Sequence, residues 1–153
     1  MAYRVSASQD VAASIEAVLD VALTADDVIS WFPLPLEAVE LPDDGRLDAG
    51  ESCVADATVL GRRLRTRITI LDADAARFRL SATGRLCLGV DARLEQTPGG
   101  CRIHAEAETR SGGGLEGRML EAASHPLLAT GLRRALARIA ELAAAGSATA
   151  RPA

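Results

Sequence analysis

The segment LEQTPGGCRIHAEAE, residues 94–108, places a turn between two runs in which apolar and polar side chains alternate. Alternation with a period of two is typical of a strand that has one buried face, and the Pro-Gly-Gly turn joins two such strands. Pairing across this turn matches apolar with apolar residues and acid with base: Leu94 with Ile103, Ala92 with Ala105, and Glu95 with Arg102. The segment therefore predicts an antiparallel hairpin with one apolar face and one charged face.

The same alternation predicts two further hairpins upstream. A two-residue turn at Gly61 and Arg62 gives the pairs Val59–Leu64, Ala57–Thr66, Ala55–Ile68, Cys53–Ile70, Thr58–Arg65 and Asp56–Arg67. A three-residue turn from Thr83 to Arg85 pairs Phe78, Leu80 and Ala82 with Val90, Leu88 and Leu86. Together the hairpins predict a sheet with a continuous apolar inner face and a solvent-exposed outer face that carries ion pairs.

Three arginines occupy alternate positions of one predicted strand: Arg63, Arg65 and Arg67. A basic stripe of this kind can bind nucleic acid, but the chain has a net charge of −4 and only 3% aromatic residues. Neither value fits a nucleic-acid binder, which needs a basic field and stacking platforms. We therefore expect the stripe to lie on the outer face, opposite or near acids such as Asp56, Glu106 and Glu108.

The remaining elements follow from turn signals and helical periodicity. Thr24 is the expected N-cap of the second helix, Pro33 and Pro35 end it, and Pro126 is expected to kink the last one. The expected strands are 3–8, 36–41, 51–60, 63–71, 76–83, 86–96 and 101–110, and the expected helices are 14–23, 25–32 and 115–145. Short turns require antiparallel pairing, so the prediction is one α+β domain, 1–145, with a disordered tail, 146–153.

Composition narrows the possible functions further. All 17 basic residues are arginine, which excludes Schiff-base lysines and the lysine of a phosphate-binding loop. Cys53, Cys87 and Cys101 have neither zinc-ligand spacing nor a disulfide pattern, so we expect free thiols in a cytoplasmic protein. We expect no signal peptide and no membrane span, which needs roughly 18 apolar residues. Two distant histidines give no metal site, and no cofactor is expected.

The predicted inner face is rich in small side chains. This composition fits either close approach of the long helix or an empty space that receives an apolar ligand, and composition alone leaves both open. The small residues on this face are Ala55, Ala57, Ala82, Ala92, Ala105 and Ala107, together with Thr66 and Thr109.

The order of elements resembles the START-like helix-grip superfamily, also called SRPBCC, and within it the polyketide cyclase/dehydrase-like branch. The similarity runs from about Tyr3 to Ala144: one strand, two short helices ending in ISWFP, the LDADAARFRL and LEQTPGGCRIHAEAE hairpins, and a long last helix. The resemblance implies a sheet of six to seven strands curved around that helix. It also implies a cavity between them that binds lipids, polyketides or similar molecules.

The candidate ligand-binding residues are those expected to face this cavity. Trp31 and Phe32 either cap the helix layer or form a wall at the cavity mouth that stacks on a planar ligand. The full candidate set is Trp31, Phe32, Ala57, Thr66, Ile68, Phe78, Leu80, Leu88, Val90, Ile103, Ala105, Thr109, Met119 and Ser124.

Candidate catalytic residues lie on the long helix, because the inner face of the sheet offers only thiols and His104 is expected to point outward. The inward stripe of the helix is Leu128, Leu132, Ala135, Ile139 and Leu142, and its backward extension is Ser124, Glu121 and Gly117. Glu121 and His125 are four residues apart and suit proton transfer. Alternatively, Pro126 turns both of them into water.

Two functions follow from these expectations. The scarcity of inward titratable groups favours a protein that binds, carries or sequesters a hydrophobic small molecule without turnover. The resemblance favours a metal-free cyclase, aromatase or dehydratase in which Glu121 and His125 assist proton transfer. An interaction domain that presents the outer face is a third possibility. The sequence predicts neither the ligand nor the oligomeric state.

Overall fold

The computed structural model describes residues 3–59, 61–74 and 76–150, with side chains described as far as residue 146. Its strands are β1 (Tyr3–Val11), β2 (Leu36–Glu40), β3 (Ser52–Val59), β4 (Arg62–Asp74), β5 (Arg77–Thr83), β6 (Leu86–Thr97) and β7 (Gly100–Ser111). Its helices are α1 (Ile15–Leu23), α2 (Ala25–Trp31) and α3 (Gly114–Ala150). Helix α3 thus continues past residue 145, where the sequence predicted its end, and residues 151–153 of the expected tail lie outside the described residues.

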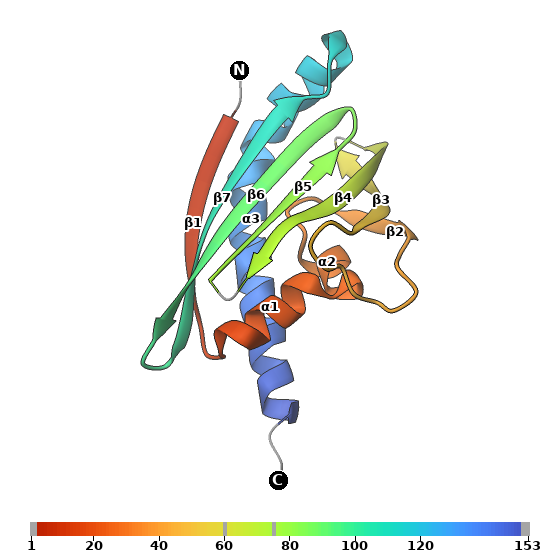
Figure 1. The fold of residues 1–153 in the computed structure, drawn as a ribbon. Helices are drawn as coiled ribbons and strands as arrows, with labels where there is room; N and C mark the ends of the chain where they lie inside the picture. Colours follow the sequence, from red (N-terminus) through yellow and green to blue (C-terminus); the bar gives the residue numbers. More distant parts are fainter. Residues whose placement is uncertain (1–2, 60, 75, 151–153) are drawn as a thin grey trace.

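The seven strands form one antiparallel sheet in the order β1-β7-β6-β5-β4-β3-β2. Helix α3 crosses one face of this sheet and packs mainly on β1 and β7, while α1 and α2 pack against α3 (Figure 1). The predicted α+β helix-grip architecture, with two short helices after the first strand and a long last helix, is confirmed.

The pairing register agrees with the sequence prediction in one hairpin and differs in two. Across β6 and β7, Leu94 lies opposite Ile103 and Glu95 opposite Arg102, as predicted. In the other two hairpins every predicted pair is displaced by two residues: Ala57 faces Leu64, Asp56 faces Arg65, Leu80 faces Val90 and Phe78 faces Ala92. A displacement of two keeps each side chain on its predicted face, so alternation of apolar residues could not detect it.

Local interactions define the short helices. The side chain of Ser14 accepts a hydrogen bond of 3.1 Å from the backbone N–H of Ala17 and caps α1. Thr24 occupies the N-cap position of α2, but its hydroxyl donates to the carbonyl of Asp20 at 2.7 Å and makes no capping bond. The predicted N-cap position of Thr24 is therefore confirmed, but the expected hydrogen bond from α2 to its side chain is not formed.

Helix α3 lies unusually close to the segment after α2. A Cβ atom at Gly131 would stand 2.3 Å from the carbonyl oxygen of Pro33, so only glycine fits at this crossing. The helix runs through Pro126 without interruption. Its predicted inward stripe is buried from Gly117 through Ile139, and Leu142 is partly buried. No helix in the described part of the chain is both long and apolar enough to span a bilayer.

Candidate functional site between the sheet and α3

The inner face of the sheet is buried and borders a small, mostly enclosed space of about 10 Å³, which we call the enclosed space. Such a volume holds about one water molecule. Its polar lining residue, Thr66, donates its hydroxyl hydrogen to the Leu64 carbonyl on its own strand at 3.2 Å. The space is lined by Phe32, Leu34, Ala57, Val59, Leu64, Thr66, Ala82, Leu86 and Leu88.

The alanines of the inner face divide between the two roles left open by the sequence. Ala105 and Ala107 belong to β7, on which α3 packs, and their small side chains permit the close approach of that helix. Ala57 and Ala82 instead border the enclosed space. Close packing of α3 thus explains the alanines of β7, whereas Ala57 and Ala82 leave room beside the enclosed space.

The predicted ligand-binding residues are buried, with one exception. Met119 is 64% exposed, because Gly117, Leu120 and Glu121 occupy the inward side of that turn of α3. It is therefore removed from the lining of any internal site. The predicted residues that border the enclosed space are Phe32, Ala57, Thr66 and Leu88; the others lie in the core around it, at Trp31, Ile68, Phe78, Leu80, Val90, Ile103, Ala105, Thr109 and Ser124.

Several lining residues were absent from the predicted set. Val59, Leu64, Ala82 and Leu86 lie on the inner face that alternation identified, so a complete reading of that pattern would have included them. Leu34 carries no such signal, because it stands between prolines in the segment after α2.

Trp31 is a core residue, only 2% exposed. Its ring contacts Phe32 at a centroid distance of 6.4 Å and meets Phe78 edge-on at 6.2 Å. The indole N–H is buried and finds no acceptor among the described residues. Trp31 thus brings an unpaired donor into an otherwise apolar region.

Glu121 and His125 form the polar end of the inner region. Glu121 is 7% exposed, so Pro126 does not turn it into water. Its Oε1 atom lies 3.9 Å from Nε2 of His125, too far for a direct hydrogen bond, and neither atom has a hydrogen-bond partner among the described residues. The imidazole stacks on the ring of Tyr3 with centroids 4.0 Å apart.

Thr109 completes this polar group. It is fully buried on β7, directly opposite Tyr3 of β1, and its hydroxyl also lacks a partner among the described residues. Directly opposed residues on one face have neighbouring side chains. We call Tyr3, Thr109, Glu121 and His125 the polar end group. Sequence reasoning found Glu121, His125 and Thr109, but missed Tyr3, whose stacking depends on the crossing of α3 over β1.

The buried thiols are poor candidates for chemistry. Burial raises the pKa of the thiols of Cys53 and Cys101, which keeps them protonated and weakly nucleophilic. Within the described ranges, no three histidine, cysteine, aspartate or glutamate side chains gather in a way that would hold a metal ion.

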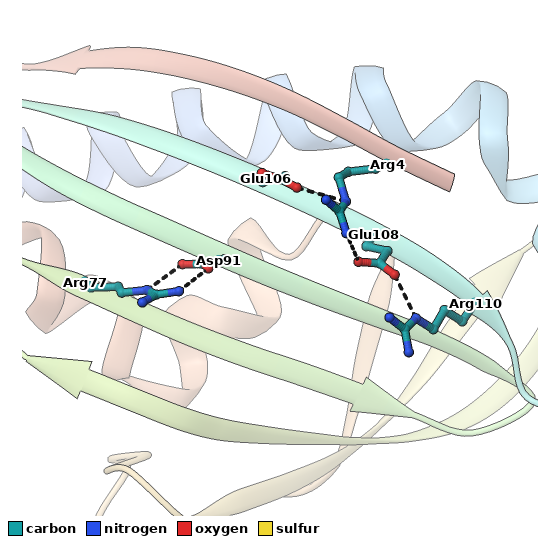
Figure 2. A network of polar contacts seen from close by, with 6 residues as sticks. All are labelled: Arg4, Arg77, Asp91, Glu106, Glu108 and Arg110. Atoms are coloured by element: carbon teal, nitrogen blue, oxygen red, sulfur yellow. Dashed lines mark hydrogen bonds and ion pairs between the residues drawn. The ribbon is translucent and has the colours of Figure 1, made fainter. Parts of the chain in front are cut away.

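The outer face contrasts with the inner one, because many of its charged side chains form ion pairs within the protein. Arg4 donates to Glu108 at 2.9 Å and lies 2.9 Å from Glu106, while Arg110 donates to Glu108 at 2.7 Å (Figure 2). The hydrogen bond from Arg110 lowers the pKa of Glu108 most, and the hydrogen bond from Arg4 lowers it further.

A second part of the outer network joins β5 to β6. Arg77 makes a bidentate contact with Asp91, in which its Nε atom donates to Oδ1 at 2.9 Å (Figure 2). This hydrogen bond lowers the pKa of Asp91. His104 also faces outward, as predicted, between Ser8 at 2.9 Å and Glu95 at 3.0 Å.

The arginine stripe lies on the outer face as predicted, with partly different partners. Arg65 contacts Asp56 at 3.2 Å and Arg63 contacts Glu37 at 3.0 Å, whereas Arg67 donates to the Ser52 hydroxyl at 3.1 Å. The acids of β7 expected nearby, Glu106 and Glu108, bind Arg4 and Arg110 instead, because β5 and β6 separate β4 from β7.

The chain belongs to the family described as polyketide cyclase / dehydrase and lipid transport, whose model matches residues 2–144. Solved structures share its fold: TTHA0849 from Thermus thermophilus has 17% identity and a TM-score of 0.71, with 95% of this chain and 99% of that chain covered. CV1439 from Chromobacterium violaceum has 16% identity and a TM-score of 0.67, with 92% and 97% covered. No curated protein matches the chain.

Proposed function

We propose that the chain binds a hydrophobic small molecule with at least one polar group between the inner face of its sheet and α3. The family and the helix-grip fold fit hydrophobic ligand binding. The observation that carries the proposal is the set of unpaired polar atoms in this apolar interior, on Trp31, Thr109 and Glu121. An unpaired buried donor or acceptor costs about 1–3 kcal/mol. A guest with a hydroxyl or carbonyl group would supply the missing partners.

Binding requires the enclosed space to widen. Ligand sites usually measure roughly 300–1,000 Å³, far more than the 10 Å³ found here. One wall of the space is the segment 32–34, which contributes Phe32 and Leu34 and lies against α3 at Gly131. We propose that this segment and α3 separate as the ligand enters.

A cyclase or dehydratase is the second candidate function, favoured by the proximity of Glu121 and His125. A carboxyl and an imidazole 3.9 Å apart at the edge of an apolar interior can accept a proton from a bound substrate and return it to a leaving oxygen. A carrier without turnover would use the same interior for binding alone.

Binding is tested by titrating Trp31 fluorescence with a long-chain fatty acid and with a naphthol. We expect a saturable change for the unaltered protein and for Thr58→Phe, which adds the same ring on the outer face of β3. Ala57→Phe fills the enclosed space and should weaken binding at least about tenfold, which corresponds to about 1.4 kcal/mol. Equal affinities for a folded Ala57→Phe and for Thr58→Phe would contradict the proposed location.

Turnover is tested separately with Glu121→Gln and His125→Asn, assayed on ligands that bind. An enzyme should lose conversion in both variants but still bind the ligand, because Gln and Asn keep a hydrogen-bonding group at each position and leave the apolar lining unchanged. Conversion at the unaltered rate in both variants would remove the pair from catalysis. Binding without conversion by the unaltered protein would identify a carrier.

A further inference from the structure

The two edges of the sheet differ in how they are protected. Edge strand β2 has five residues, a register shift between Ala38 and Glu40, and a proline beyond each end, Pro35 and Pro42. Short length, irregularity and nearby prolines all hinder pairing with another chain. Edge strand β1 has nine residues, contains no proline, and pairs with β7 in unbroken register from Tyr3 to Val11.

Among the described residues, no strand lies beside the outer edge of β1. Within the described residues, the backbone of β1 forms ladder hydrogen bonds with β7 and with no other strand. On the free side, one side chain interacts locally: Nε2 of Gln9 donates to the carbonyl of Asp10 at 2.9 Å. Helix α3 covers the inner face of β1 and not its edge (Figure 1). A long, straight and unpaired edge is a template for another strand.

The sequence of β1, YRVSASQDV, is complementary to itself when read antiparallel about Ala7. Such a pairing places the cationic end of one strand against the anionic end of the other, and serine against serine. The opposed residues are Tyr3 with Val11, Arg4 with Asp10, Val5 with Gln9, Ser6 with Ser8, and Ala7 with Ala7.

The charges at the two ends are accessible for this pairing. The side chains of Arg4 and Asp10 are 61% and 74% exposed, and both belong to the outer face. In a two-fold pair, Arg4 would add Asp10 of the second copy to its present partners Glu106 and Glu108. Asp10, which binds Arg102 at 2.6 Å, would add Arg4 of the second copy. Edge charges of one sign would repel a second copy, whereas this arrangement attracts it.

We propose that β1 is a dimerisation edge, where it pairs antiparallel with β1 of a second copy about a two-fold axis at Ala7. The pairing joins two seven-stranded sheets into one and places both copies of α3 on the same face. It supplies roughly one backbone hydrogen bond per pair of opposed residues, besides the two ion pairs between Arg4 and Asp10. This inference is independent of the ligand-binding proposal.

The test uses sedimentation equilibrium of the full chain over a wide concentration range, with two matched variants. Ser6→Lys with Ser8→Lys puts like charges opposite each other across the axis. Ser6→Lys with Ser8→Glu changes the same two exposed positions but puts opposite charges there. Both variants remove the contact of Ser8 with His104, so that loss does not distinguish them.

We expect the unaltered chain to dimerise and the lysine–lysine variant to raise the dimer dissociation constant at least about tenfold. The lysine–glutamate variant should stay within about threefold of the unaltered chain. A chain that remains monomeric at all concentrations would overturn the proposal. This would hold even if β1 paired with a strand of a different protein, because the proposed partner is a second copy of this chain. A dimer that both variants leave unchanged would place the interface elsewhere and would also overturn it.

Discussion

The polar groups on the outer face of the sheet and those in the interior differ in whether they have partners within the protein. On the outer face, Arg77, Asp91 and Glu108 all have charged partners, and they remain in contact with solvent. In the interior that the inner face borders, Trp31 of α2 and Thr109 of β7 are buried without a hydrogen-bond partner among the described residues. These three outer-face charges therefore have partners without a ligand, whereas the interior has unused hydrogen-bonding capacity. This difference directs the search for function to the interior.

The largest predicted difference between the faces comes from two neighbouring residues of β5. Phe78 is buried and packs against Trp31, so Phe78→Ala should lower the free energy of unfolding by about 3–5 kcal/mol. Arg79 points to the outer face and pairs with Asp72, and Arg79→Ala should cost less than about 1 kcal/mol. Urea denaturation of both variants measures the difference. Equal losses would mean that the faces do not differ as described.

Substitution of two glycines, one where α3 meets the segment after α2 and one on the outer face, should give an intermediate difference in stability. Gly131→Ala forces a Cβ against the Pro33 carbonyl and should destabilise the protein by about 1–3 kcal/mol. Gly89, on the outer face of β6, has open space around the position of a Cβ, and Gly89→Ala should be neutral or slightly stabilising. Thermal unfolding distinguishes them. A harmless Gly131→Ala would show that α3 can move away from the segment after α2 at little cost.

The smallest predicted effect concerns the pH dependence of the outer face. Asp91 has a lowered pKa in the folded protein because Arg77 hydrogen-bonds to its charged form. Its contribution to stability is therefore present above the unfolded-state pKa of about 3.9 and is lost as pH falls through the folded-state value. Arg77→Gln should raise the pKa of Asp91, which NMR titration measures, and reduce stability at neutral pH slightly.

The stability of the Arg77→Gln variant should approach that of the unaltered protein as pH falls from about 4 through the lowered folded-state pKa of Asp91. Below that folded-state pKa, Asp91 is protonated in both proteins. A difference in stability that stays constant down to strongly acidic pH would contradict this linkage.

The sequence was sufficient to predict which face each strand residue occupies, because a period of two depends only on local alternation. It was insufficient to predict the register of two hairpins, since a displacement of two residues preserves every face. Asp56 thus faces Arg65 and not Arg67. Turn geometry sets this displacement, and the turn residues did not reveal it.

Helical periodicity was sufficient to predict which residues of α3 face inward. Glu121 and Ser124 are buried on the inward side of α3 as expected, whereas Met119 is not, because it lies off the inward stripe. The stacking of Tyr3 on His125 depends on the crossing of two elements far apart in sequence. The volume of the enclosed space likewise depends on the tertiary packing of many side chains, which no local pattern records.

Methyl-resolved NMR during a fatty-acid titration tests the central claim most directly. If the ligand enters between the sheet and α3, the methyl signals of Leu88, Ile68 and Ile103 on the inner face should shift and saturate together. The signal of Leu71, which is exposed, should remain in place. Unchanged inner-face methyl signals at saturating ligand, or shifts confined to exposed residues such as Leu71 and Leu115, would contradict an internal binding site.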